Sequence, residues 1–438
     1  MLRSITSSNI SIKNLKNLNN ERKNIIIQGF VKKLQKRGKN YFAHINDGIT
    51  RDQIQAIIPR NQVEKINVGT SIKICGEWVK SLGNQQDYEL LSSSCMVYNI
   101  NQEQPIKGSN DLLRSIPHLR IKDDTFQMII KLRSKLNYLT HKYFNENNFV
   151  YIDTPLLSLN DCEGAGEAFV VKAQNDDDFF GENNIYLPVS GQLHLEACIG
   201  GLPKVYTING AFRAEKSLSR QHMAEFRMLE VEVGFCDNIE ILCELVEDYI
   251  KYLCNEFKEN EDDIKEIQKI FSDKDNKNNL MGMINDKEFP KLEYNECVEI
   301  LKKLKKRKTI DGFNKDEEFA LINYTNSPLF VTNFPSNQKP FYMKRFTNNG
   351  IELYTKSFDF LSPYVGELAG GSIREDSINE LKKYDIKNLD WYINLRKHGY
   401  PISGGFGIGV DRLMQSMFGI SNIKDTIPFP RYYKHCKC

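Results

Sequence analysis

The sequence predicts an α+β fold, in which a small N-terminal β-barrel precedes a larger domain of mixed helices and strands. Short β-rich runs between residues 24 and 99 are separated by Gly, Asn and Asp turns. This spacing indicates a barrel of about five strands. Apolar residues at helical spacing over Phe126–Phe144 indicate an amphipathic helix, and Val205–Val233 reads as a β-hairpin with a charged tip.

Length and charge limit the alternatives. A chain of 438 residues is long enough for two or three domains. Lys and Arg total 59 against 57 for Asp and Glu, so the net charge is +2. This balance gives no bulk attraction to nucleic acid, and any such site must be local.

Cysteine usage and hydropathy exclude other classes. The ten cysteines include no CxxC pair, so we expect no zinc site and a reducing compartment. No apolar run approaches the roughly 18 residues needed to span a bilayer. We therefore expect a soluble protein without a membrane partner.

Residues 1–19 form a candidate targeting segment. They contain Arg3, Lys13 and Lys16, and no acidic residue occurs before Glu21. This composition is typical of a mitochondrial targeting peptide, and a disordered basic N-terminus is the competing interpretation. We expect a mitochondrial matrix protein, with the cytoplasm as the alternative.

Composition also predicts the domain boundaries. The barrel is expected over residues 20–101, where Gly29 and Gly76 let strands coil tightly. A polar hinge over 102–118 contains Pro105 and Gly108 and leads into a domain over 119–438. There the amphipathic helix is followed by a strand that begins at 149 and is closed by a proline.

The hairpin carries the densest charge. Glu230 and Glu232 alternate with apolar residues, so both carboxylates point to one face of the sheet. Arg213, Glu215, His222 and Glu225 surround them, which is typical of a site for a highly charged ligand. A solvated hairpin with ordinary cross-strand ion pairs is the alternative.

These residues carry a resemblance. Phe212-Arg-Ala-Glu215, the loop to His222-Met-Ala-Glu-Phe226, and Glu230-x-Glu232 resemble motif 2 of class II aminoacyl-tRNA synthetases. Within that class the chain is most similar to the asparaginyl-tRNA synthetase family, of organellar or bacterial type. The resemblance extends over residues 24–431. It implies an OB-fold anticodon-binding barrel, a catalytic domain with an antiparallel sheet flanked by helices, and a homodimer joined through the helix, strand and proline of motif 1.

The resemblance also implies a reaction. L-asparagine is activated with ATP to asparaginyl-adenylate and pyrophosphate, and the acyl group then passes to the 3′ end of tRNA(Asn), with Mg²⁺ on the ATP phosphates. Arg213 and Arg412 would be the catalytic residues. The remaining roles implied are amino-acid binding by Glu163, Gln192, Glu230 and Arg374; ATP binding by Arg213, Glu215, His222, Phe226, Glu367, Gly409 and Arg412; and metal binding by Asp359 and Glu367.

Two departures from the aspartyl enzymes favour asparagine. Leu195 stands where those enzymes have a lysine that neutralises the substrate carboxylate, and Glu230 stands where they have Asp. A pocket without that cation favours a neutral side chain. An aspartate–tRNA ligase, including a non-discriminating one, is the alternative. A catalytically silent paralogue and a free-standing asparagine-forming ligase are the other two.

The glycine-rich run Ser403–Met414 has several meanings by itself, including a nucleotide loop or a tight strand-to-helix junction. Arg412 at the start of a helix makes it similar to class II motif 3, with Asp411 where Glu is more usual. The family's Arg just before His222 is Gln221 here, which leaves the γ-phosphate contact open. No GxxxxGK[ST] occurs, so a P-loop enzyme is set aside.

The resemblance assigns three barrel residues to the tRNA anticodon. Phe42 would stack on a base, while Gln55 and Glu89 would hydrogen-bond to base edges. A plain barrel-core role for Phe42 is the competing interpretation. The family's usual Arg pair reads Leu34-Gln35 here.

Three segments lie outside the motifs. Residues 238–257 show the apolar spacing of a helix, whereas the charged, Asn-rich residues 259–279 predict a surface excursion. The basic run 302–308 reads as a solvated helix face or as an RNA contact.

Overall fold

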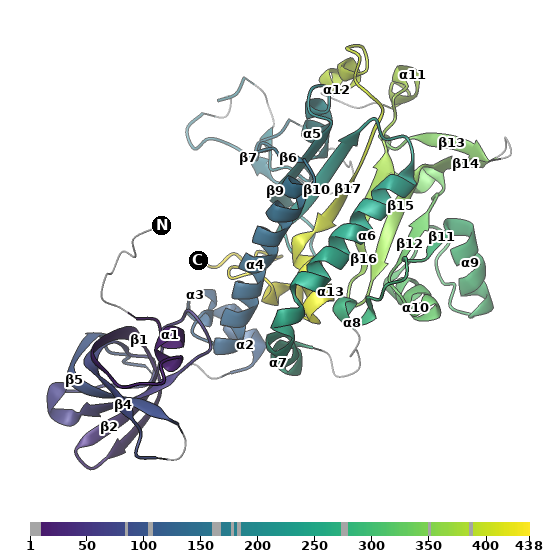
Figure 1. Cartoon of the computed structure of the whole chain (residues 1–438). Helices are drawn as coiled ribbons and strands as arrows, with labels where there is room; N and C mark the ends of the chain where they lie inside the picture. Colours follow the sequence, from purple (N-terminus) through teal and green to yellow (C-terminus); the bar gives the residue numbers. More distant parts are fainter. Residues whose placement is uncertain are drawn as a thin grey trace. The chain divides into compact units, whose positions relative to one another are not determined.

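The computed structural model describes residues 10–83, 86–103, 108–159, 168–176, 179–181, 185–272, 279–348, 352–384 and 389–438. The chain divides into two compact units, Met1–Ser109 and Asn110–Cys438 (Figure 1). The division falls inside the predicted hinge at 102–118.

In the part of the first unit that is described, five strands close into a barrel, as predicted. In the order around the barrel they are β1 (Arg22–Arg37), β2 (Asn40–Asn46), β3 (Ile54–Pro59), β5 (Tyr88–Asn99) and β4 (Ser71–Lys80). Two glycines allow the strands to come close. A Cβ on Gly29 would lie 2.5 Å from the Asn46 carbonyl oxygen, and one on Gly76 would lie 2.1 Å from that of Leu91. The barrel therefore requires glycine at both positions.

A short helix, α1 (Ile12–Lys16), precedes β1 and belongs to the barrel. The Ser11 side chain caps it by accepting from the Asn14 backbone N–H. Ile12 and Leu15 are fully buried in the barrel core. Ordered structure thus begins ahead of residue 20, where the sequence predicted the barrel to start.

Within the described residues of the second unit, eight strands form one sheet. Their order is β11 (Lys291–Glu293), β12 (Leu329–Thr332), β15 (Ser357–Ser362), β16 (Gly366–Ile373), β17 (Ser403–Gly409), β10 (Glu225–Gly234), β9 (Lys204–Phe212) and β6 (Val150–Tyr151). The inner pairs are antiparallel, as the resemblance implied, and the outermost pair at each edge is parallel. The strand expected from 149 is only two residues long.

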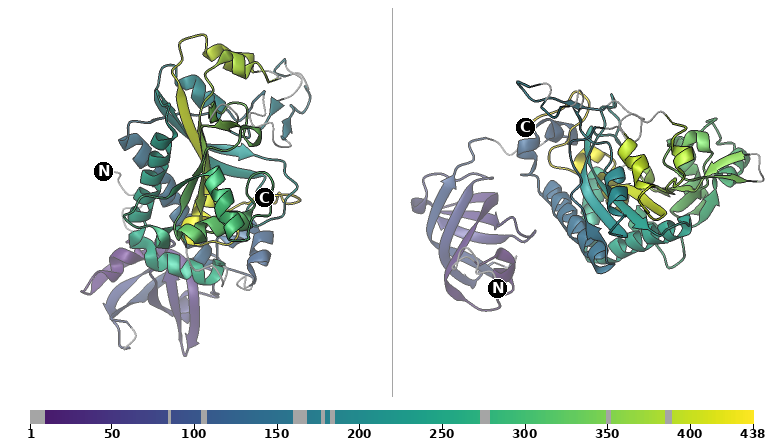
Figure 2. Two further views of the ribbon diagram at one scale, coloured as in Figure 1. Left: turned by 90° about the vertical axis from the view of Figure 1, so that its right-hand side faces the viewer. Right: turned by 90° about the horizontal axis from the view of Figure 1, so that it is seen from above.

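Among the described residues, the longer helices that pack against this sheet in one core are α4 (Asp124–Glu146), α6 (Ile239–Glu256), α7 (Glu261–Phe271) and α13 (Val410–Phe418). Asp123 caps α4 and Asn238 caps α6, each accepting a backbone N–H of the first turn. Figures 1 and 2 show α4 and α6 along the same face of the sheet. Both helices match their predicted ranges to within two residues.

Helix α7 corrects the prediction of a surface excursion at 259–279. Ile264, Ile267 and Phe271 are buried in the main core. Their spacing of three and four residues puts them on one helical face, and the charged residues between them point to solvent. The high charge of the segment masked this narrow apolar stripe. The rest of the predicted excursion, residues 273–278, lies outside the described residues.

The basic run 302–308 is only partly a solvated helix face. Helix α9 (Tyr294–Lys303) ends inside it. The Arg307 side chain is 13% exposed and donates to the carbonyl oxygens of Ile310 and Gly312 at 2.8 Å. One of the basic residues therefore supports a loop, and the prediction was wrong for it.

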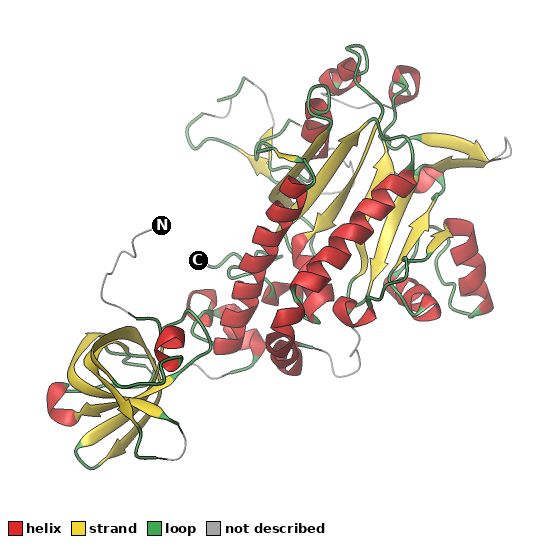
Figure 3. Ribbon diagram, viewed as in Figure 1, coloured by secondary structure: helices red, strands yellow, loops and turns green. Residues whose placement is uncertain are grey.

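The smaller elements of the second unit connect the sheet strands (Figure 3). They are α2 (Asn110–Ser115), α3 (Pro117–Arg120), β7 (Val170–Val171), β8 (Ile185–Tyr186), α5 (Gln192–Cys198), α8 (Leu280–Met283), α10 (Lys315–Thr325), β13 (Arg345–Asn348), β14 (Glu352–Thr355), α11 (Ile378–Leu381) and α12 (Asp390–Leu395). Among the described residues, the helices are either too short or too polar to cross a lipid bilayer.

Candidate active site

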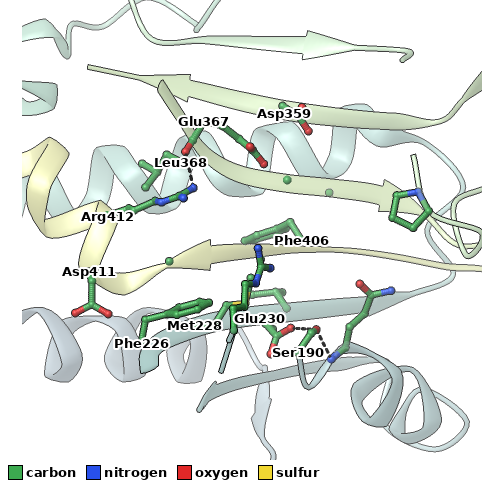
Figure 4. A pocket seen from close by; sticks show the side chains of 18 of the residues that line it. Ser190, Phe226, Met228, Glu230, Asp359, Glu367, Leu368, Phe406, Asp411 and Arg412 are labelled. Atoms are coloured by element: carbon green, nitrogen blue, oxygen red, sulfur yellow. Dashed lines mark hydrogen bonds between the residues drawn. The ribbon is translucent and has the colours of Figure 1, made fainter. Parts of the chain in front are cut away.

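One cavity of about 560 Å³ gathers the candidate residues of the second unit. Its walls come from β10, β15, β16 and β17, from the loop after β9, and from the start of α13 (Figure 4). The described candidates that line it are Gln192, Arg213, Glu215, His222, Phe226, Glu230, Asp359, Glu367, Arg374, Gly409 and Arg412. This volume suits a ligand the size of a nucleotide joined to an amino acid. Glu163 lies outside the described residues.

The glycine-rich run is a strand rather than a nucleotide loop. It forms β17, which pairs with β10 and leads directly into α13 at Val410. Glu230 lies opposite Gly407 and Glu232 lies opposite Gly405. A Cβ on Gly405 would lie 2.1 Å from a Glu232 carboxylate oxygen. Gly405 therefore leaves room for the Glu232 carboxylate beside the cavity.

Glu230 is fixed at one end of the cavity. Its side chain is buried, and its carboxylate accepts from the Ser190 hydroxyl and, at 2.8 Å, from the Gly191 backbone N–H. Figure 4 shows this pair, with Ser190 directly beside Glu230. Leu195 contributes an apolar wall and is itself buried. This end thus presents a positioned acceptor next to an uncharged surface.

Arg374 lies at the same end, held by Glu232. Its Nη2 and Nε atoms donate to the Glu232 carboxylate at 2.7 and 3.1 Å, and Nη1 donates to Ser372 Oγ at 2.9 Å. Both side chains of the ion pair are buried. Although burial opposes it, the charge of Glu232 raises the pKa of Arg374, so the guanidinium stays charged. Glu232 thereby offsets most of the positive charge at this end.

Gln192 belongs to a second buried network. Its Nε2 donates to Glu196 Oε1 at 3.0 Å. The other Glu196 oxygen accepts from Tyr392 at 2.7 Å and from Arg396 at 2.9 Å. Glu196 also lies 3.7 Å from Arg374 Nε. The Glu196 carboxylate therefore connects Gln192 with Arg374, two of the four amino-acid-binding candidates.

The hairpin tip forms the opposite end. The Arg213 guanidinium lies 5.7 Å from the Phe226 ring centroid. His222 Nε2 is 3.9 Å from Glu215. Burial, together with the charge of Arg412, lowers the pKa of His222 below its ordinary value. His222 is therefore neutral near pH 7.

A pair of carboxylates lines a third part of the cavity, separate from the two ends described above. Asp359 on β15 and Glu367 on β16 approach one point, since a Cβ on Gly370 would lie 3.6 Å from Asp359 Oδ1 and 3.5 Å from Glu367 Oε1. Lys339 Nζ contacts both Asp359 oxygens, at 2.6 and 2.8 Å. Burial raises the pKa of Asp359 against the opposing charge of Lys339. Arg412 Nη1 donates to the Glu367 carbonyl oxygen at 3.4 Å.

Comparison with known proteins identifies the family and the fold. The family described as "tRNA synthetases class II (D, K and N)" matches residues 109–433. The asparagine–tRNA ligase of Mycoplasma genitalium is 35% identical over 94% of this chain and 95% of its own. That of Borreliella burgdorferi is 37% identical over 94% and 96%. The chain belongs to the asparaginyl-tRNA synthetase family of class II.

Solved structures agree with this membership. Asparaginyl-tRNA synthetase from Pyrococcus horikoshii, complexed with asparaginyl-adenylate, superposes with a TM-score of 0.86. It is 26% identical to this chain and covers 98% of it, while the chain covers 99% of that protein. The predicted combination of an OB-fold barrel with a class II catalytic domain is confirmed.

Asp411 and Glu225 are both paired with arginine residues of the protein. Asp411 is buried and accepts from Arg133 Nη1 at 2.6 Å and from the Arg227 backbone N–H at 3.0 Å. It joins α13 to α4 and β10, although it borders the cavity. Glu225 pairs instead with Arg227 at 3.5 Å. This ion pair lies within strand β10, so it is not one of the cross-strand pairs that the alternative interpretation requires.

Of the three anticodon candidates, Phe42 and Gln55 lie on the outer face of the barrel, whereas Glu89 is buried beside Gln55. Phe42 is half-buried between Tyr41 and Ala43, which point into the core. The interpretation of Phe42 as a core residue is therefore wrong. Gln55 lies on the same outer face, and its Nε2 donates to Glu89 at 2.8 Å. Leu34, in contrast, packs against the barrel core.

Sequence reasoning missed three residues at the cavity, Lys315, Glu318 and Lys339, and it missed the role of Glu232. The alternation with Glu230 already placed Glu232 on the correct face of β10. Its role as the ion-pair partner of Arg374 could not be predicted, because the two residues are 142 positions apart in the sequence. The two lysines and Glu318 belong to no pattern that the sequence alone distinguishes.

Proposed function

We propose that the chain activates L-asparagine with ATP and transfers it to the 3′ end of tRNA(Asn). The observation that carries this proposal is the convergence of three groups on one cavity. These are phosphate-binding guanidinium groups, an aromatic surface for the base, and a buried, nearly neutral pocket for the amino acid. The names of the relatives support the same reaction.

In the first step a carboxylate oxygen of asparagine attacks the α-phosphorus of ATP. The new bond is the carboxyl-to-phosphorus anhydride, the bond to the bridging β-phosphate oxygen breaks, and pyrophosphate leaves. Arg213 lines the cavity, and its guanidinium would contact both the α-phosphate and the substrate carboxylate as charge accumulates. No protein nucleophile is required, because positioning and electrostatics lower the barrier.

The base would be held between Phe226 and Arg412. Both side chains line the cavity at the hairpin end, and an aromatic face and a guanidinium group bind a purine from its two sides. Glu215 would accept from the adenine amino group. Gly409, at the end of β17, allows the nucleotide to approach the backbone.

Glu230 is proposed to select the amide over the acid. An asparagine NH₂ group would donate to this carboxylate, whereas an aspartate would place a second negative charge against it. Leu195 supplies no compensating cation, and Arg374, already paired with Glu232, would bind the side-chain oxygen. Glu163 would hold the α-ammonium group.

The acidic corner fits Mg²⁺. Asp359 and Glu367 offer the hard oxygen donors that this ion prefers, and Mg²⁺ in such sites keeps phosphates and waters in the rest of its shell. Two carboxylates from the protein would therefore suffice, with phosphates and waters completing the shell. The ion would neutralise the phosphates.

The second step and the assembly involve the outer surfaces. Phe42, Gln55 and Glu89 would contact the anticodon, and the 3′-hydroxyl of the tRNA would take the acyl group, releasing AMP. A homodimer is supported by Tyr138 on α4 and by Val150 and Tyr151 on β6, whose exposed fractions are 66%, 43% and 39%. Sedimentation of the purified protein tests this assembly.

ATP–pyrophosphate exchange tests the function directly. Exchange that depends on asparagine, and not on aspartate, is expected. Equal exchange with both amino acids would identify a non-discriminating enzyme. No exchange with either would refute the proposal, while charging of tRNA(Asn) tests the second step.

The compartment is a separate proposal. We infer mitochondrial import, and a relative from Dictyostelium discoideum, 34% identical, is described as a probable mitochondrial asparagine–tRNA ligase. Because α1 packs into the barrel core, the targeting information would precede Ile12. A fusion of residues 1–19 to a fluorescent protein should enter mitochondria; retention in the cytoplasm would refute this.

A further inference from the structure

Two lysines face the cavity near the carboxylate pair. Lys315 is the first residue of α10, and Lys339 follows the short 3₁₀ helix Ser336–Gln338. They come from separate elements, and both line the part of the cavity that contains Asp359 and Glu367. The sequence motifs assign no role to either lysine.

Of the cations in the hairpin tip, Arg213 lines the cavity, whereas Lys216 and Arg220 do not. Gln221 is neutral, and its Nε2 donates to the Tyr364 carbonyl oxygen at 2.9 Å. His222 is uncharged near neutral pH because burial and Arg412 lower its pKa. The charge of Arg374 is matched by Glu232. A polyphosphate extending past Arg213 would therefore need cations from another element.

Each lysine is held at the cavity wall by a carboxylate. Lys339 Nζ contacts Asp359 and lies 3.8 Å from the Phe334 ring centroid, and its side chain is 14% exposed. Lys315 Nζ contacts Glu318 at 2.8 Å. The same Glu318 oxygen accepts from the Glu367 backbone N–H at 2.9 Å. Both ammonium groups are thus positioned beside the proposed metal ligands before any phosphate arrives.

We infer that Lys315 and Lys339 bind the β- and γ-phosphates of ATP, in place of the charged side chain that Gln221 does not provide. This inference rests on the proposed function, since it requires ATP in this cavity. An ammonium group can exchange a carboxylate for a phosphate oxygen with little movement, because both are anionic acceptors of the same hydrogen bonds.

Binding of metal-free nucleotides tests this assignment without catalysis. In Lys315→Met and in Lys339→Met, calorimetric titration should show ATP bound about tenfold more weakly, because a charge-assisted hydrogen bond is lost. The affinity for AMP, which lacks both phosphates, should change by less than about twofold. Lys302→Met on α9, where Lys302 pairs with Glu299, is the matched control and should bind both nucleotides as the parent does.

Repeating the Lys339→Met titration in an Asp359→Asn protein separates two roles of Lys339, phosphate binding and neutralisation of the Asp359 carboxylate. If Lys339 only neutralises that carboxylate, Lys339→Met will cost no ATP affinity once Asp359→Asn has removed the charge. We expect the loss to persist in that background. Unchanged ATP affinity in either single variant, equal weakening of AMP, or no loss in the Asp359→Asn background would overturn the inference. Asparagine-dependent exchange by the parent enzyme reports separately on the proposed function.

Discussion

Removing the charge of Glu232 should expose how the buried ion pair shapes the pocket. Glu232→Gln keeps the volume of the side chain and one acceptor oxygen, but leaves Arg374 charged and 4% exposed. Breaking a buried ion pair costs roughly 3–5 kcal/mol. Glu196, 3.7 Å from Arg374, offsets part of this cost. We therefore expect about 3 kcal/mol of destabilisation, the lower end of that range.

The same variant should relax the choice of amino acid. With Arg374 no longer neutralised, the pocket gains positive charge and receives an aspartate carboxylate more readily. The ratio of exchange with asparagine to exchange with aspartate should fall by about tenfold or more.

Thermal denaturation and the exchange assay measure the two effects independently. Glu225→Gln, on the same strand and in a partly exposed pair with Arg227, is the matched control. This control variant should lose less than about 1 kcal/mol of unfolding free energy, and its ratio of exchange with asparagine to exchange with aspartate should stay unchanged. If Glu232→Gln is as stable as the parent, or keeps its full preference for asparagine, the view of Glu232 as a neutralising partner is wrong.

Three further outcomes follow from the structure. Gly405→Ala should destabilise the protein by about 2 kcal/mol, because the new Cβ would lie 2.1 Å from a Glu232 carboxylate oxygen. Gly201→Ala is the control, since open space surrounds that position, and it should leave the stability unchanged. The melting temperatures of the two variants measure this difference. The depressed pKa of His222 means that the folded state binds fewer protons than the unfolded chain as pH falls below about 6.5, so stability is lost there. The slope of unfolding free energy between pH 6.5 and 5 should flatten in His222→Gln, and an unchanged slope would assign the effect elsewhere. Phe42→Ala should raise the KM for tRNA, because the loss of one stacked base weakens binding by roughly 1–3 kcal/mol. The rate of ATP–pyrophosphate exchange should stay constant. A loss of exchange would indicate misfolding instead.

The sequence was sufficient where local patterns coincide with family motifs. The hairpin alternation placed Glu230 and Glu232 on one face, and the glycine run led to Arg412. Helix α7 was missed because Ile264, Ile267 and Phe271 form a stripe of only three residues among many charges. A narrow stripe suffices for burial when the rest of the helix faces solvent.

Partners distant in sequence could not be predicted. Glu232 meets Arg374 across 142 positions, and Asp359 on β15 meets Lys339 in a loop that no periodicity describes. The face of Phe42 depended on barrel register, since a shift of one residue exchanges the inner and outer side chains. These relationships arise from tertiary packing.

The order of strands in the large sheet has a consequence for biosynthesis. Strand β17 is the last to be made, yet it lies between β10 and β16. The edge of β10 that pairs with β17 therefore stays unpaired until about 170 further residues have been translated. At roughly 5–20 residues per second this interval is on the order of 10–30 s. During that time the nascent chain exposes an open strand edge, which is the kind of surface that chaperones protect from aggregation.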